Sequence, residues 1–168
     1  VNVEAPLCSQ LQPTQKIGPN MRSDPSCASI LAEAGFTVAG LANNHAMDFG
    51  PEGLNQTINN ILRANMTPVG AGVDLQSAQK PTILKCGTAT VAIIAACERE
   101  FGIANELNPG VAPADIISLL EQLEWSRDNA DLVFITLHAG IEMFPLPPPA
   151  LRRLCRYLVT KGADGVFC

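Results

Sequence analysis

The segment that most restricts the fold is the run from 132 to 138, Leu-Val-Phe-Ile-Thr-Leu-His, which is almost wholly apolar. Such a run is typical of a β-strand that is covered on both faces of its sheet, because a half-exposed strand alternates apolar and polar residues. We therefore expect this strand at the centre of a sheet with helices on either side.

The rest of the chain alternates between segments typical of helices and of strands. Helices are expected over 24–34, 51–62, 74–79, 113–127 and 149–161, and strands over 36–42, 67–70, 82–86, 90–96 and 165–168. The strands at 82–86 and 90–96 resemble a hairpin, and 5–25 has no periodicity and is expected to be a long loop. This order predicts the α/β class with a largely parallel sheet covered by helices.

Two of the expected helices have an identifiable apolar face. In the helix over 51–62 that face consists of Leu54, Ile58, Ile61 and Leu62. In the helix over 113–127 it consists of Ile116, Ile117, Leu120 and Leu123. Both faces are predicted to pack on the sheet.

Composition excludes several classes of protein. The 168 residues suit one domain, and 47% apolar against 16% charged residues is typical of a globular chain. The net charge of -5 and the lack of any basic run argue against nucleic acid or an anionic membrane as partner. No apolar run approaches the roughly 20 residues of a membrane span. Residues 1–4 do not resemble a signal peptide. Cytoplasm and cell envelope both remain open as locations.

The cysteines give little sign of a disulfide framework or a zinc site. The chain has six cysteines, and no two form a Cys-x-x-Cys pair. We expect most of them to be small buried apolar residues, which favours a reducing compartment. They are Cys8, Cys27, Cys86, Cys97, Cys155 and Cys168.

Polar side chains capable of chemistry follow directly after two of the expected strands. One set follows the strand at 36–42, and the other ends or follows the strand at 132–138. The two sets together hold Asn43, Asn44, His45, Asp48, His138 and Glu142, including both histidines of the chain. Ligands of open α/β sheets bind beyond the carboxyl ends of the strands, so this arrangement favours a shared site.

The first set supports two interpretations. Asn44 offers an amide oxygen suited to a metal, and His45 offers an imidazole that titrates near neutral pH. Alternatively the segment is a polar loop, in which Asn43 takes a left-handed conformation and Asp48 caps the following helix.

The other candidate residues also have two interpretations. His138 at a strand end is a common type of metal ligand, and Gly140 would let backbone approach a ligand. A hydrogen-bonded histidine at a sheet edge explains it equally well. Alternation places Asn2 and Glu4 on one face of an N-terminal strand, which an ordinary surface strand would also do.

Four segments resemble the bacterial capsule-synthesis CapA/PgsA family, which is similar to the calcineurin-like metallophosphoesterases. They are NVEAPL at 2–7, GFTVAGLANNHAMDFGPEGLNQTINNILRANMTPVGAG at 35–72, DLVFITLHAGIEM at 131–143 and LVTKGADGVFC at 158–168. The Ala-Asn-Asn-His-Ala-x-Asp-x-Gly core is the most specific part. The resemblance covers nearly the whole chain and implies a layered metallophosphoesterase-like fold.

The resemblance also implies roles for individual residues. Glu4, Asn44 and His138 would be metal ligands, and His45 would be the general acid or transition-state donor. The remaining candidates would support these groups or contact the substrate, and they are Asn2, Asn43, Asp48 and Glu142.

The chain departs from the family pattern in three places. The Gly-Asp strand that carries a metal-binding Asp should precede Val1, and the His-His-Pro-His segment should follow Cys168. Ala139 stands where the family has Trp. The resemblance therefore implies a single partial domain over 1–168 with about half of the ligands that a two-metal centre needs. We expect Mn, Fe or Zn in the complete protein and little or no metal bound by these residues alone.

The resemblance leaves two classes of function. One is a metal-dependent hydrolase, a phosphoesterase or amidase, linked to a polyanionic capsule polymer such as poly-γ-glutamate or its precursor. The other is a non-catalytic assembly or export component that works with capsule synthase subunits. The sequence does not separate them, because both would keep the same residues.

Overall fold

The computed structural model describes all residues from Val1 to Cys168. Its helices are α1 (Cys27–Glu33), α2 (Gly50–Arg63), α3 (Leu75–Ala78), α4 (Ile116–Asn129) and α5 (Pro149–Thr160). Its strands are β1 (Val38–Gly40), β2 (Thr67–Val69), β3 (Ala71–Gly72), β4 (Thr82–Cys86), β5 (Ala89–Cys97), β6 (Gly110–Val111), β7 (Leu132–His138) and β8 (Gly165–Phe167). None of the helices combines the length and apolar character needed to cross a bilayer.

The strands form three small sheets instead of the single, largely parallel sheet that we expected. The largest has the order β4-β5-β7-β8, in which β5, β7 and β8 are parallel. β4 is antiparallel to β5, as the expected hairpin requires, because only Gly87 and Thr88 connect them. β1 pairs with β2 in parallel, and β3 pairs with β6 antiparallel. The α/β class is confirmed, and the sheet is divided.

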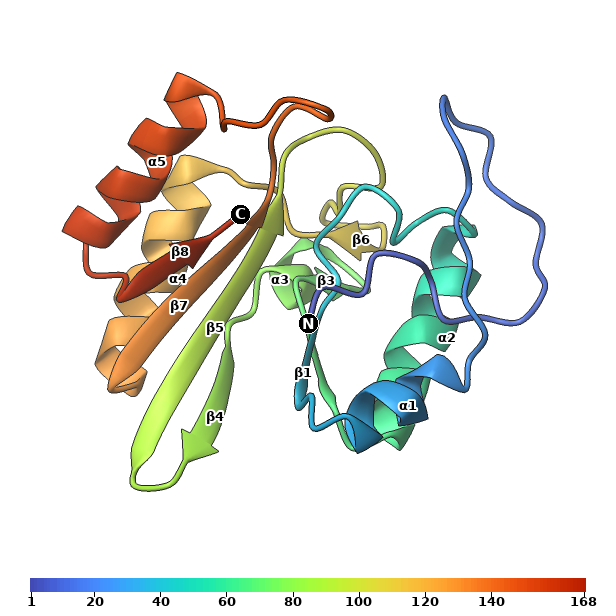
Figure 1. The fold of residues 1–168 in the computed structure, drawn as a ribbon, viewed down its shortest axis with the longest axis horizontal. Helices are drawn as coiled ribbons and strands as arrows, with labels where there is room; N and C mark the ends of the chain where they lie inside the picture. The colour runs from blue at the N-terminus through green and yellow to red at the C-terminus, as the bar shows by residue number, and fades with distance from the viewer.

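The central strand β7 is covered fully on only one face. Val133, Ile135 and Leu137 are at most 2% exposed and pack with residues of α4 and α5. Phe134, Thr136 and His138 point the other way and are only half-buried. An apolar groove of about 370 Å³ lies along that second face, lined also by residues of β1 and β2. Figure 1 shows α4 and α5 on one side of the β5–β7–β8 strands, with β1, α1 and α2 on the other. The apolar sequence therefore predicted more complete burial of β7 than the structure shows.

Helix α4 buries a stripe that overlaps only in part with the predicted face: Leu123 is buried and Leu120 packs on the core, but Ile116 and Ile117 are exposed. Its buried positions are Leu119, Gln122, Leu123 and Ser126, at the i, i+3, i+4, i+7 spacing of one helix face. Ile117 lies off this stripe and is 67% exposed. The two polar residues within the stripe hide it from a search for apolar periodicity. In α2, Leu54 and Ile61 are buried as expected, while Leu62 is 51% exposed.

The long loop before α1 packs on α2. The Leu7 N–H donates to Thr57 Oγ1 at 2.9 Å, and Asn60 Nδ2 donates to the Leu7 carbonyl at 2.8 Å. Asp24 accepts from the Ser26 N–H at 2.9 Å, in a turn that precedes the first helical residue. The helix therefore begins three residues later than predicted, and the loop is fixed at both ends.

Candidate functional site

A polar cleft of about 610 Å³ opens at the carboxyl ends of β5 and β7. The Glu98 N–H donates to the His138 carbonyl at 3.1 Å, which holds the two strand ends together. The cleft is lined by Glu4, Lys16, Ile17, Gly18, Pro19, Asn44, His45, Glu98, Glu100, residues 137–142 and Cys168. The structure thus brings into one cleft five of the predicted site residues, namely Glu4, Asn44, His45, His138 and Glu142.

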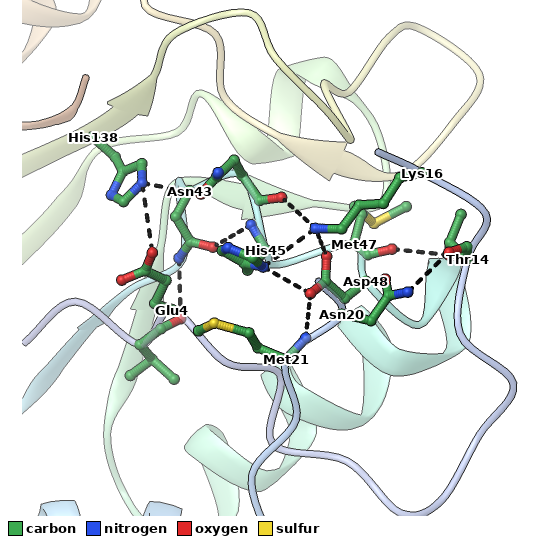
Figure 2. Close-up of polar contacts among 12 residues, drawn as sticks. Glu4, Thr14, Lys16, Asn20, Met21, Asn43, His45, Met47, Asp48 and His138 are labelled. Atoms are coloured by element: carbon green, nitrogen blue, oxygen red, sulfur yellow. Dashed lines mark hydrogen bonds and ion pairs between the residues drawn. The ribbon is translucent and has the colours of Figure 1, made fainter. Parts of the chain in front are cut away.

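Three of these side chains direct metal-type donor atoms at one another. His138 Nε2 lies 3.1 Å from Asn44 Oδ1 and 3.9 Å from Glu4 Oε1. Each donor comes from a different part of the fold: His138 ends β7, Asn44 follows β1, and Glu4 follows a residue whose N–H bonds to the end of β1. Figure 2 shows the His138 ring facing Glu4 across the cleft. The Glu4 and His138 side chains are 42% and 32% exposed, so a ligand can reach them.

The geometry fits part of a site for a divalent ion. Two ligands at right angles, each about 2.1 Å from an ion, are separated by about 3 Å. The 3.1 Å between His138 Nε2 and Asn44 Oδ1 matches this separation, while the 3.9 Å to Glu4 Oε1 requires a wider angle at the ion. One carboxylate, one amide oxygen and one imidazole suit Mn²⁺, Fe²⁺ or Zn²⁺. Nowhere in the chain do three or more His, Cys, Asp or Glu side chains form a metal-holding group, so Asn44 is needed to make three donors. These three side chains fit an ion held by three protein donors, whose remaining coordination positions would be filled by further ligands.

Beside these donors lies a buried charged network built on Asp48. Asp48 is fully buried, and its Oδ2 contacts His45 Nδ1 at 2.8 Å and accepts from the Met21 N–H at 2.6 Å. Its Oδ1 forms an ion pair with the ammonium of Lys16, whose side chain is only 7% exposed. Figure 2 shows Lys16 reaching from the long loop to Asp48. The lysine offsets the charge of a carboxylate that burial would otherwise disfavour.

The network fixes the orientation of the His45 ring. Lys16 Nζ lies 3.2 Å from His45 Nδ1, but Asp48 Oδ2 is closer. The negative carboxylate attracts a ring N–H, whereas the positive ammonium repels one. We therefore assign the neutral ring's proton to Nδ1, donated to Asp48. Nε2 then remains as the nitrogen available to the cleft that His45 lines. This is the arrangement in which a carboxylate orients an acid–base histidine.

Asn43 and Asn2 shape the turn that carries these residues. Asn43 is fully buried, its Nδ2 donates to the Val3 carbonyl at 3.0 Å and to Asn2 Oδ1 at 3.3 Å, and its Oδ1 accepts from the His45 N–H at 3.1 Å. The alternative that Asn43 takes a left-handed conformation is wrong, since the non-glycine residues with positive φ are Asn65 and Met143. Asn43 thus links the N-terminal segment to the turn.

One further interpretation from the sequence is corrected. Asp48 does not cap α2, whose N-cap residue is Phe49 without a side-chain cap, because its carboxylate is taken by the buried network. Within the chain, a Cβ at Gly140 would meet nothing within 4 Å, so no contact with neighbouring protein atoms requires glycine there. Its φ of 140° lies in a region that favours glycine. Glu142 is exposed on the rim of the cleft.

Three further residues that line the cleft, Lys16, Glu98 and Glu100, were not predicted from the sequence. Glu98 directly follows β5, so the rule that sites form beyond strand ends would have found it. Lys16 lies in a loop without periodicity, and nothing in the sequence around it indicates that it reaches the cleft.

The cysteines are less buried than expected. Only Cys8 and Cys97 are buried, while Cys86 at the tip of the β4–β5 hairpin and Cys168 after β8 are exposed. Burial, with Glu100 and Glu98 nearby, raises the pKa of Cys97 to about 12. Burial and the hydrogen bond with Cys155, at 3.4 Å between sulfurs, raise the pKa of Cys168 to about 11. Neither thiol is an activated nucleophile at neutral pH.

The sequence of the chain is similar to that of capsule proteins along its whole length. A family model described as bacterial capsule synthesis protein PGA_cap matches residues 1–168. The chain is 32% identical over 148 residues to the PGA biosynthesis protein CapA of Bacillus subtilis (strain 168), covering 86% of this chain and 39% of that protein. It is 33% identical over 138 residues to the capsule biosynthesis protein CapA of Bacillus anthracis, covering 79% and 34%. The chain thus spans less than two fifths of the length of these relatives.

The fold is similar to that of a solved phosphoesterase. The crystal structure of the calcineurin-like phosphoesterase YfkN from Bacillus subtilis matches with a TM-score of 0.58 and 18% identity, covering 86% of this chain and 47% of that one. At this identity the likeness concerns the fold, which is a partial metallophosphoesterase-like one.

Proposed function

This chain belongs to the family of bacterial capsule synthesis proteins, and we propose that its polar cleft contributes to a metal-dependent hydrolysis in the biosynthesis of a capsule polymer such as poly-γ-glutamate. The observation that carries the proposal is the convergence of His138 Nε2, Asn44 Oδ1 and Glu4 Oε1 beside a buried His–Asp pair. Metal donors and an oriented acid–base group in one cleft are the parts that hydrolysis needs.

Each residue has a separate task in this proposal. Glu4, Asn44 and His138 would hold a divalent ion, which when bound supplies an activated water and a Lewis acid. When its ring carries a proton on each nitrogen, His45 would give the Nε2 proton to the leaving group and keep the Nδ1 proton that Asp48 accepts. Asp48 holds the ring through Nδ1 and stabilises it when it carries both protons.

The charge of the cleft supports dependence on a metal. Glu4, Glu98, Glu100 and Glu142 line it, and its one lysine is already paired with Asp48. These carboxylates repel a phosphate or carboxylate group of a substrate unless bound cations offset them. An anionic polymer or precursor would therefore enter together with divalent ions.

The test compares two histidine variants, each made in a protein that extends over the full length of these relatives. A phosphodiester and a γ-glutamyl amide should both be offered in the presence of Mn²⁺. His45→Ala should reduce kcat by about 10²–10⁴-fold while Mn²⁺ affinity is retained. His138→Ala should lose Mn²⁺ binding and activity together, and Glu33→Gln, an exposed carboxylate outside the cleft, serves as the control.

One combination of results would reject hydrolysis. If the full-length protein binds Mn²⁺ but hydrolyses neither substrate, and His45→Ala still supports polymer production in cells, the cleft is not catalytic. The protein would then be a non-catalytic assembly or export component of the polymer synthase.

A further inference from the structure

The outward face of α5 carries the densest positive charge of the molecule. The segment from Pro149 to Lys161 holds four of the eleven basic residues and none of the sixteen acidic ones. The rest of the chain has seven basic residues against those sixteen acidic ones. Positive charge is therefore concentrated on one helix of an otherwise acidic protein.

Helix geometry gathers three arginines on one face. Arg152, Arg153 and Arg156 are exposed, and at 100° per residue they lie opposite the stripe that packs on the core, formed by Leu151, Leu154, Cys155 and Leu158. In the sequence they form no continuous basic run, so only helix formation makes them a cluster. We call these three residues the α5 arginine face. Figure 1 shows α5 on the outside of the sheet, on the opposite side of the molecule from α1 and α2.

The α5 arginine face has no anionic partner within the chain. None of its three guanidinium groups takes part in an ion pair or side-chain hydrogen bond, whereas Arg127 pairs with Asp164 at 2.8 Å. Arg22 likewise donates to the Cys8 carbonyl at 3.1 Å. The α5 guanidinium groups therefore keep all their donors free for an external acceptor.

From this charge complementarity we propose that the α5 arginine face binds a carboxylate polymer, the chemistry of poly-γ-glutamate. Guanidinium groups bind carboxylates through two parallel hydrogen bonds. Three of them within about 6 Å along a helix can bind successive carboxylates of one chain, so that individually weak pairs act together. The acidic cleft could not bind such a chain without cations, which makes α5 the surface that retains it. The inference rests on the capsule role of the proposed function but not on hydrolysis.

A short segment connects the cleft to α5, so the cleft and the α5 arginine face are close together in the sequence. Residues 139–142 line the cleft and 149–160 form the helix, so fewer than ten residues separate them. The intervening segment exposes Met143, Phe144 and Leu146, which would suit insertion into a lipid surface. An anionic membrane is therefore the competing occupant, and the test separates it from the polymer.

The experiment measures binding of fluorescent poly-γ-glutamate by anisotropy, with a chelator present so that no metal contributes. Arg152→Gln/Arg153→Gln/Arg156→Gln should weaken binding about tenfold. The matched control Arg63→Gln/Lys80→Gln/Lys85→Gln removes the same charge from exposed positions elsewhere and should change affinity less than about twofold. Raising salt from about 20 mM to about 150 mM should weaken the wild-type complex.

Two results would overturn the inference. Equal weakening in both triple variants would mean diffuse attraction without a defined face. Wild-type binding to vesicles rich in anionic phospholipid, without binding to the polymer, would assign the face to a membrane. Because no metal is present, failure here leaves the metal-dependent hydrolysis untouched, and failure of hydrolysis leaves this binding result standing.

Discussion

Replacement of Asp48 by Asn should destabilise the chain severely. Asp48 is fully buried and neutralises Lys16, whose side chain is 7% exposed. The substitution keeps the volume of the side chain but removes the negative charge, so the ammonium is left buried with no anion. It also weakens the hydrogen bonds that fix His45 and the Met21 N–H.

The expected cost follows from the burial of the pair. Breaking a buried ion pair by removing one partner typically costs about 3–5 kcal/mol, because the remaining charge is uncompensated. This is a large fraction of the roughly 5–15 kcal/mol that stabilises a typical domain. Lys16→Met should also destabilise, and the double variant Lys16→Met/Asp48→Asn should cost less than the sum of the two single variants.

Urea unfolding followed by circular dichroism measures the effect. Midpoints and slopes of wild type, the two single variants and the double variant give the free energies of unfolding and the coupling between the residues. Asp128→Asn, an exposed carboxylate on α4, is the control and should change stability by less than about 0.5 kcal/mol. A cost below about 1 kcal/mol for Asp48→Asn, or strictly additive costs, would refute the argument for a buried ion pair.

Three further outcomes are expected. In the folded protein the pKa of Cys97 is raised from 9.0 to about 12. Its contribution to stability is therefore complete below pH 9 and is lost as the pH rises from 9 to 12. In urea titrations, wild type should lose about 2–3 kcal/mol more stability than Cys97→Ala between pH 9 and 11. Oxidised glutathione should join Cys155 to Cys168, whose sulfurs lie 3.4 Å apart; mass spectrometry should find the intramolecular disulfide, and glutathione attached to either thiol in its place would contradict this. Leu123→Ala should cost about 2–5 kcal/mol and Ile117→Ala less than about 1 kcal/mol, since only the first leaves a core cavity; similar costs would contradict the observed register of α4.

The sequence predicted which residues share a cleft better than it predicted the sheet. His138 and Asn44 could be placed together because parallel strands end at a common edge, and His138 ends one apolar run while Asn44 follows another. The division into three sheets could not be predicted, because it depends on which strand edges meet in space. β1 and β2 pair with each other over three residues each, and β1 also forms one bridge, from Gly40 to Asn2.

The role of Lys16 illustrates why the rest of the site was missed. Its contact with Asp48 joins residues 32 positions apart through a loop without regular structure. Local sequence patterns do not predict such a contact, because it depends on the path of the whole loop, which is also held on α2 through Leu7. The alternative that Asp48 caps α2 failed for the same reason, since a carboxylate before a helix is typical of a cap.

An NMR titration with Mn²⁺ can show whether Glu4, Asn44 and His138 form one metal site. In a nitrogen-15-labelled sample of the 168-residue chain, the paramagnetic ion broadens amide resonances near the place where it binds, even when binding is weak. We predict that the amides of Glu4, Asn44 and His138 broaden first and that His138→Ala removes this selectivity. Broadening spread over exposed carboxylates such as Glu106, or an unchanged pattern in His138→Ala, would contradict this prediction.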